Sequence, residues 1–123
     1  MAFRWCRANM GVNRRKKYQP AWYIRKSLDD TTFDAGEYDA HDNEIYIYWN
    51  NCETVEDLIV AIVHEWTHQL QPILTKYDWD SDYHTNPYEV EARRNEKIWG
   101  PQCWNALKQK LNKKPKRNGI SNK

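Results

Sequence analysis

The stretch 54–71, TVEDLIVAIVHEWTHQLQ, constrains the fold of this chain more than any other. Its apolar residues recur at helical spacing and gather on one side of a helical wheel, which predicts an amphipathic helix packed on a core. Thr54 and Asp57 form a capping-box start, and the helix must end before Pro72, because proline cannot continue the hydrogen-bond ladder. The rest of the domain is therefore expected to pack around this helix.

The same helix carries His64, Glu65 and His68 in HExxH spacing. Residues four apart lie one turn above each other, and both imidazoles project from the side opposite the apolar stripe. Two neutral imidazoles stacked in this way can share one Zn²⁺, and Glu65 is placed to take a proton from a metal-bound water. A solvated polar helix face with a chance match is the alternative. The helical context favours metal binding.

A second helix is predicted over 87–99, with Asn86 as N-cap and Pro87 at its first position. Glu89 and Glu91 lie in its first turns, and a site with two histidines needs a third ligand. These two side chains point about 200° apart on a helix, so only one can face the histidines. Ala92, three residues after Glu89, would allow a close helix approach on that face, which favours Glu89. A helix-capping role for Glu89 and ligation by Glu91 remain open.

The loop 72–86 between the two helices is long for so small a domain, and such loops are usually functional. It contains His84, a further alternative for the third metal ligand. It also contains Tyr83, which together with Tyr88 is a candidate for contact with an oxyanion or a substrate. Only their positions in the sequence support these three assignments.

Two stretches before the central helix, 32–40 and 44–49, are rich in β-branched and aromatic residues and predict an antiparallel hairpin. Gly36 within it indicates a bulge or a close backbone approach. Residues 21–28 fit a strand or a short helix, and Pro101 is expected to restart a short helix. We therefore predict an α+β domain, with a small antiparallel sheet on the apolar face of the HExxH helix and a second, ligand-bearing helix closing the cleft.

Charge is distributed unevenly along the chain. Residues 1–19 and 107–123 are basic and contain no acid, whereas all 17 acidic residues lie between them. We therefore predict a basic N-terminal arm (1–19), a folded domain (20–111) and a basic disordered tail (112–123). The two basic ends predict weak contact with nucleic acid or another polyanion.

Aromatic residues are expected to fill the core, because the mean hydropathy of -1.05 leaves few aliphatic side chains for it. The three cysteines are far apart and form no CxxC motif, so we expect free thiols in a reducing compartment. No apolar run is long enough to span a membrane, and the N-terminus lacks the apolar region of a signal peptide. We expect a soluble cytoplasmic protein without membrane contact.

With both helices considered, residues 33–99 resemble the small gluzincins, including ImmA-type and SprT-like compact zincins. AGEYDAHDNEIYIYW looks like the hairpin that precedes their active-site helix, and its last strand resembles the edge along which they lay an extended substrate. NPYEVEAR looks like their Glu-x-x-Ala segment. Those families usually follow the Ala with Asp or Asn, whereas this chain has Arg93.

The resemblance implies a zinc-dependent peptidase that hydrolyses peptide bonds in a peptide or protein substrate. Zn²⁺ would be held by His64, His68 and Glu89, and Glu65 would be the general base. Two alternatives remain open. One is a SprT-like, nucleic-acid-associated protease tethered by its basic ends, and the other is a non-catalytic zinc-stabilised binding or structural module.

Overall fold

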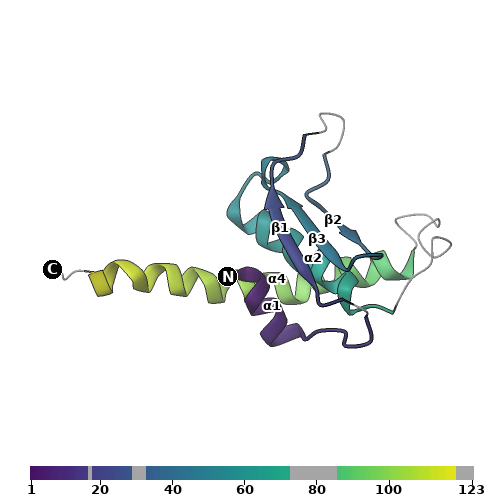
Figure 1. Ribbon diagram of the computed structural model, residues 1–123. Coiled ribbons are helices and arrows are strands. Elements are labelled where there is room, and N and C mark those ends of the chain that lie inside the picture. The colour runs from purple at the N-terminus through teal and green to yellow at the C-terminus, as the bar shows by residue number, and fades with distance from the viewer. Residues whose placement is uncertain (17, 29–32, 73–85, 119–123) are drawn as a thin grey trace.

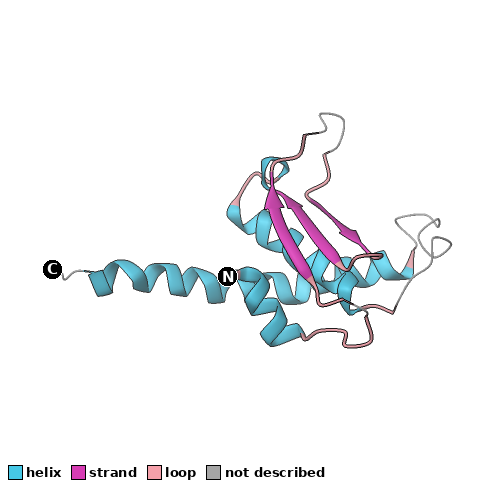
Figure 2. Ribbon diagram, viewed as in Figure 1, coloured by secondary structure: helices cyan, strands magenta, loops and turns pink. Residues whose placement is uncertain are grey.

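The structure, a computed structural model, describes residues 1–16, 18–28, 33–72 and 86–118, with side chains as far as residue 110. These residues form an α+β fold with one small sheet (Figures 1 and 2). The elements in chain order are α1 (Ala2–Met10), β1 (Ala21–Arg25), β2 (Gly36–Asp39), β3 (Glu44–Tyr48), the short 3₁₀ helix η1 (Trp49–Asn51), α2 (Val55–Leu70) and α4 (Pro87–Asn118).

Helix α2 is the predicted central helix, and its start is confirmed: the Thr54 side-chain oxygen accepts a hydrogen bond from the backbone N–H of Asp57 at 3.1 Å. Its apolar side packs on the sheet and on α1, and the core side chains share very low exposure. They include Ile45, Ile47, Ile59, Ile62, Val63 and Trp66. Because α4 lies along another side of α2, every residue from 61 to 69 is buried. This part of the central helix is therefore enclosed rather than half-exposed, whereas its first residues, 55–57, are exposed.

The predicted hairpin is confirmed by antiparallel pairing of β2 with β3, from Gly36 opposite Ile47 to Asp39 opposite Glu44. Its turn is stabilised locally, because Asp39 Oδ1 accepts hydrogen bonds from the backbone N–H groups of two turn residues. Asn43 completes the turn at φ 56°, a left-handed conformation that Asn tolerates better than most residues.

The sheet as a whole is mixed, so the prediction of an antiparallel sheet is wrong for its third strand. Residues 21–25 form β1, which pairs in parallel with β3 on the side away from β2. The direction of this pairing is set by tertiary contacts, which a short apolar run does not encode. The order β1-β3-β2 also places β3 in the centre, so the sheet edge beside α2 is β2 and not the last strand of the hairpin.

Helix α1 corrects the prediction of a basic arm over 1–19. Ala2, Phe3 and Cys6 are buried in the core. The Phe3 ring stacks on Trp22 with centroids 5.0 Å apart, and the indole of Trp66 lies close to both rings. Aromatic packing, which a charge count does not reveal, therefore docks the first ten residues on the body.

Helix α4 is continuous from Pro87 to Asn118, whereas two helices separated near Pro101 and a disordered tail from residue 112 were predicted. The segment beyond Pro101 packs on the core through Cys103 and Leu107, which are 0% and 6% exposed. Gly100 brings α4 close to α2, because a Cβ there would lie 3.4 Å from Val60 Cγ2. The C-terminal part of α4 extends past the body (Figure 1).

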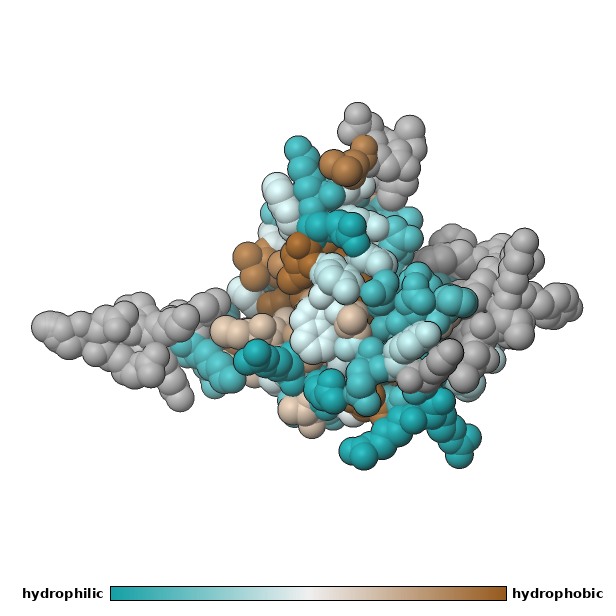
Figure 3. All heavy atoms as spheres, in the orientation of Figure 1, coloured by the Kyte–Doolittle hydropathy of each residue, from teal (hydrophilic) through white to brown (hydrophobic). Residues whose placement is uncertain are grey.

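Apolar atoms gather at one place on the face of the molecule drawn in Figure 3. Figure 3 shows a mostly hydrophilic face on which apolar atoms gather near the end of β1, where Ile24 and Leu28 are exposed. Among the helices that the structure describes, none has the length and apolar character needed to cross a bilayer. The cytoplasmic location stays a prediction.

Candidate metal centre

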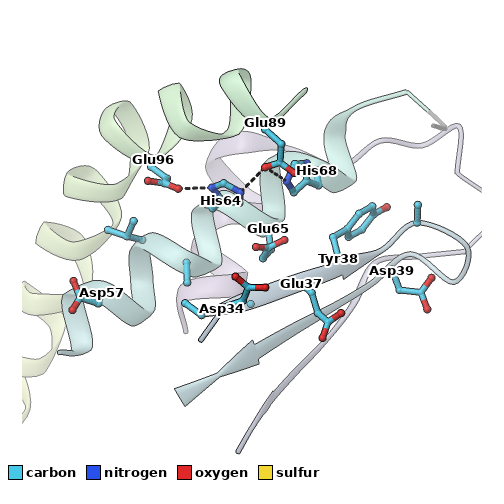
Figure 4. Close-up of a pocket in the computed structure, with 15 residues that line it drawn as sticks. Asp34, Glu37, Tyr38, Asp39, Asp57, His64, Glu65, His68, Glu89 and Glu96 are labelled. Carbon is cyan, nitrogen blue, oxygen red and sulfur yellow. Dashed lines mark hydrogen bonds and ion pairs between the residues drawn. The ribbon is translucent and has the colours of Figure 1, made fainter. Parts of the chain in front are cut away.

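The side chains of His64, His68 and Glu89 meet where α4 crosses α2 (Figure 4). Glu89 Oε1 lies 3.1 Å from His64 Nε2 and 3.3 Å from His68 Nε2. Ligands held about 2.1 Å from a tetrahedral Zn²⁺ stand about 3.4 Å from one another. Both distances from Glu89 are close to this value, and the ligand atoms of all three residues lie within 4.8 Å of one another.

Of the two acids predicted as the third ligand, Glu89 and not Glu91 lies beside the two histidines. Ala92 is fully buried one turn after Glu89, as expected if a small residue lets α4 approach α2 closely. Glu91 Oε1 instead accepts a hydrogen bond from Gln71 Nε2 at 2.8 Å. The N-cap is confirmed too, since Asn86 Oδ1 accepts a hydrogen bond from the backbone N–H of Tyr88 at 2.9 Å.

The structure gives little or no information on the other three residues predicted from the sequence, His84, Tyr83 and Tyr88. His84 and Tyr83 fall in 73–85 and so lie outside the described residues. Tyr88 is half-buried at the start of α4, and its backbone carbonyl accepts a hydrogen bond from Gln71 Nε2 at 2.8 Å. Contact of Tyr88 with an oxyanion or substrate stays a prediction.

Both imidazoles are oriented by contacts on their other nitrogen. The Glu96 carboxylate bonds His64 Nδ1, and Gln71 Oε1 lies 2.9 Å from His68 Nδ1. Each Nδ1 faces an acceptor and each Nε2 faces Glu89, so a metal placed between Glu89 and the rings would take the Nε2 lone pairs while each Nδ1 keeps its proton. Outer contacts of this kind are typical of histidines that ligate metal.

Neither Glu96 nor Gln71 was identified from the sequence. A signal was available for both: Glu96 follows Glu89 by seven residues, which is two helical turns on the same face, and Gln71 follows His68 by three. A helical position alone, however, does not distinguish these residues from solvated polar side chains.

Glu65 lies in the cleft with 7% of its surface exposed, and no hydrogen bond to its carboxylate is found within the described part of the chain. Burial raises the pKa of Glu65 to about 7, against the lowering effect of His64 and His68. Gly36 on β2 makes room for it, because a Cβ there would lie 3.1 Å from Glu65 Cγ and 2.9 Å from Ile47 Cδ1. Gly36 thus marks the close backbone approach predicted from the sequence.

The pKa values of two candidate ligands, His64 and Glu89, are strongly shifted in opposite directions. Burial alone would lower the pKa of His64, but hydrogen bonds to Glu89 and Glu96 outweigh it and raise that pKa to about 10. Burial would likewise raise the pKa of Glu89, but hydrogen bonds from His64 and His68 lower it to about 2. The site is therefore built to hold positive charge, as a proton on His64 or as a cation in its place.

Tyr38 and Lys16 support the site from the β2 side. The Tyr38 ring stacks beside His68 with centroids 6.2 Å apart. Lys16 Nζ donates hydrogen bonds to Tyr38 Oη at 2.6 Å and to the backbone carbonyl of His68 at 3.3 Å. Lys16, which was expected in a basic arm, therefore links Tyr38 to the end of α2 that carries His68.

A cleft of about 670 Å³ opens in front of these residues, between α2, α4 and the β2 edge (Figure 4). Its lining is rich in acids and contains no Lys or Arg among the described residues. The acidic residues are Asp34, Glu37, Asp39, Asp57, Glu65, Glu89 and Glu96.

Comparisons of the chain with models of protein families, with curated proteins and with solved structures find no match. The residues of the site therefore carry the functional inference. Two imidazole nitrogens and a carboxylate oxygen form a donor set that suits Zn²⁺, and three protein ligands leave a fourth position for water or substrate. Among the described residues this group offers three ligand atoms, the number of protein ligands that catalytic zinc sites typically have.

Proposed function

We propose that this chain is a zincin-like, zinc-dependent peptidase. His64, His68 and Glu89 hold Zn²⁺, and Glu65 is the general base. One observation carries the proposal: two imidazole nitrogens converge on one carboxylate oxygen at metal-ligand spacing, beside a buried glutamate that has no hydrogen-bond partner in the described part of the chain.

Bound Zn²⁺ supplies a Lewis acid that acidifies water and polarises a carbonyl group. Glu65 accepts a proton from the attacking water as the water oxygen bonds to the scissile carbonyl carbon. The same carboxyl then gives the proton to the amide nitrogen as the C–N bond breaks, so the products are a carboxylate and an amine. A pKa of about 7 suits both transfers, because the group gains and loses a proton readily near neutral pH.

Glu96 and Gln71 act by holding the histidines. Each accepts the Nδ1 proton of one ring and so directs the other nitrogen toward the ligand position. Gln71 is itself held through its amide nitrogen by the Tyr88 carbonyl and the Glu91 carboxylate. Such positioning residues typically change metal affinity or activity by about 10- to 100-fold when removed.

The β2 strand offers a place for an extended substrate. It is an edge strand, its residues line the cleft, and Glu65 lies directly against Gly36. An extended peptide added to such an edge gains main-chain hydrogen bonds that do not depend on its side chains. This geometry supports a peptide substrate that pairs with β2, since β3 lies in the centre of the sheet.

Metal analysis and peptide cleavage together test this proposal, with Glu65→Gln as the deciding variant. The parent protein should bind one zinc per chain and cleave a casein-derived peptide mixture. Glu65→Gln should keep the zinc and lose about a hundredfold or more of the cleavage rate, because an amide does not accept the proton. Glu56→Gln, an exposed change on the same helix outside the cleft, should retain both properties.

Two results would contradict the proposal. Parent protein without bound zinc, and without a rise in melting temperature on adding zinc, would exclude the metal site. Zinc bound at full occupancy with no cleavage of any peptide would favour a non-catalytic zinc-stabilised module.

A further inference from the structure

The acids of the cleft contrast with the rest of the molecule. The chain has a net charge of +2, yet seven acids line this one cleft and no described Lys or Arg does. A metal with its three ligands would neutralise only the inner part. The outer part, toward Asp57 and Asp34, stays negative.

The chemistry of the cleft changes along α2. Asp57, Val60, Ala61 and His64 all line it, so an acidic group, an apolar floor and the metal-ligand position follow one another along this helix. Asp57 precedes His64 by seven residues, which corresponds to about 10 Å along the axis. Figure 4 shows Asp57 at the far end of the cleft and Asp34 on the same side of the site as Glu65.

These carboxylates are available to a ligand. In the described part of the chain neither Asp34 nor Asp57 forms an ion pair, and their side chains make no hydrogen bond that would neutralise them. Glu65, aimed into the same cleft and 7% exposed, also has no hydrogen-bond partner there. A polar side chain buried to that extent without a partner indicates that a ligand completes the site.

We propose that the cleft selects peptide substrates carrying Lys or Arg beside the scissile bond, with that side chain directed toward Asp57. The aliphatic stem would lie on Val60 and Ala61, and the charged head would reach Asp57. A long stem with a terminal charge matches an apolar floor that ends in a carboxylate. This inference rests on the proposed peptidase function and specifies its substrate class.

Three matched peptides test the inference. They carry Lys, norleucine or Glu at one position next to the cleaved bond and are otherwise identical, and the test is run with both neighbouring positions in turn. At one position we expect the kcat/KM of the Lys peptide to exceed that of norleucine by about three- to fivefold and that of Glu by more, as one partly exposed charge contact allows. The preference should shrink at 0.5 M NaCl, because salt screens this contact.

Asp57→Asn should reduce the ratio of Lys to norleucine to about one-third or less of its parental value, whereas Glu56→Gln should leave the ratio unchanged. Glu56 is a suitable control because it precedes Asp57 on the same helical turn but does not line the cleft. A parental ratio near one at both positions, a preference for Glu, or a ratio that Asp57→Asn does not alter would overturn the inference.

Binding separates this inference from the activity on which it rests. Zinc-loaded Glu65→Gln protein should bind the fluorescein-labelled Lys peptide more tightly than the norleucine or Glu peptide in fluorescence anisotropy. Equal dissociation constants for the three peptides would overturn the inference without bearing on hydrolysis. Preferential binding of the Lys peptide by a zinc-loaded parent that cleaves none of them would contradict the peptidase function and uphold the charge preference.

Discussion

Zinc binding should compete with a proton on His64, and pH is the perturbation that measures this competition. Hydrogen bonds to Glu89 and Glu96 raise the pKa of His64 to about 10, so the metal-free site is protonated at neutral pH. A metal ligand must be deprotonated, and each zinc therefore displaces this proton. Below the pKa, the apparent affinity should rise about tenfold per pH unit for one displaced proton.

Between pH 6.5 and 8.5 this reasoning predicts about a 100-fold gain in zinc affinity from His64 alone. Competition against a chromophoric chelator of known pH dependence, at constant ionic strength, measures the slope. Calorimetry in buffers of different ionisation enthalpy counts the protons released. Glu96→Gln removes one of the three carboxylates that raise the pKa of His64, so its slope should flatten within this window, whereas Glu56→Gln should follow the parent. An affinity independent of pH over these two units would refute the reasoning.

The metal-free protein provides an independent check with the same sign. The pKa of His64 is raised above its ordinary value, so its charged interactions stabilise the fold fully below about pH 6.5 and are lost as the pH rises through about 10. The pKa of Glu65 is also raised, to about 7, so its contribution to stability likewise falls as the pH rises, mainly below pH 8. The melting temperature of the metal-free protein should therefore fall between pH 6.5 and 8, and a constant or rising value would contradict the assignment. Above pH 8 the pKa of Lys16, which burial lowers to about 8, adds a contribution of the opposite sign.

Three further variants test particular elements. Glu89→Ala should lower zinc affinity by orders of magnitude, while Glu91→Ala keeps zinc, and the reverse result in a metal assay would move the ligand to Glu91. Phe3→Ala should lower the free energy of unfolding in urea by about 3–5 kcal/mol, against little change for the exposed Arg4→Ala; equal effects would show that α1 is not part of the core. Gly36→Ala should reduce cleavage more than zinc content, because the added Cβ would press on Glu65; unchanged cleavage would contradict this contact.

Much of the fold could be predicted where the signal is local. The start of α2 at Thr54, the β2–β3 hairpin and the start of α4 after Asn86 each depend on neighbouring residues that form caps or turns. The pairing of His64 with His68 is equally local, because it follows from helical spacing. The approach of Glu89 to the histidines could be predicted because Ala92, a small residue on the same helix face, indicated a close crossing of the two helices.

The incorrect predictions concern elements whose conformation depends on distant contacts. A proline within a helix costs about 3 kcal/mol, which favoured a break at Pro101. Burial of Leu107 beyond it contributes roughly 1.5–3 kcal/mol, and Cys103 adds to this, so packing on the core offsets the local cost. The docking of α1 and the parallel pairing of β1 depend in the same way on partners far along the chain.

The candidate site inherits this dependence, because its residues come from elements that only packing brings together. His64, Glu65 and His68 lie on α2, whereas Glu89 and Glu96 lie on α4 and reach the histidines only if the two helix axes are close. That closeness depends on small side chains at the contact, where Ala92 is fully buried and Gly100 lies against Val60. Partly buried carboxylates facing imidazoles are costly unless a proton or a cation lies between them. The packing that buries α2 therefore also places carboxylates where a proton or a cation stabilises them. Fold stability and zinc affinity should consequently increase or decrease together.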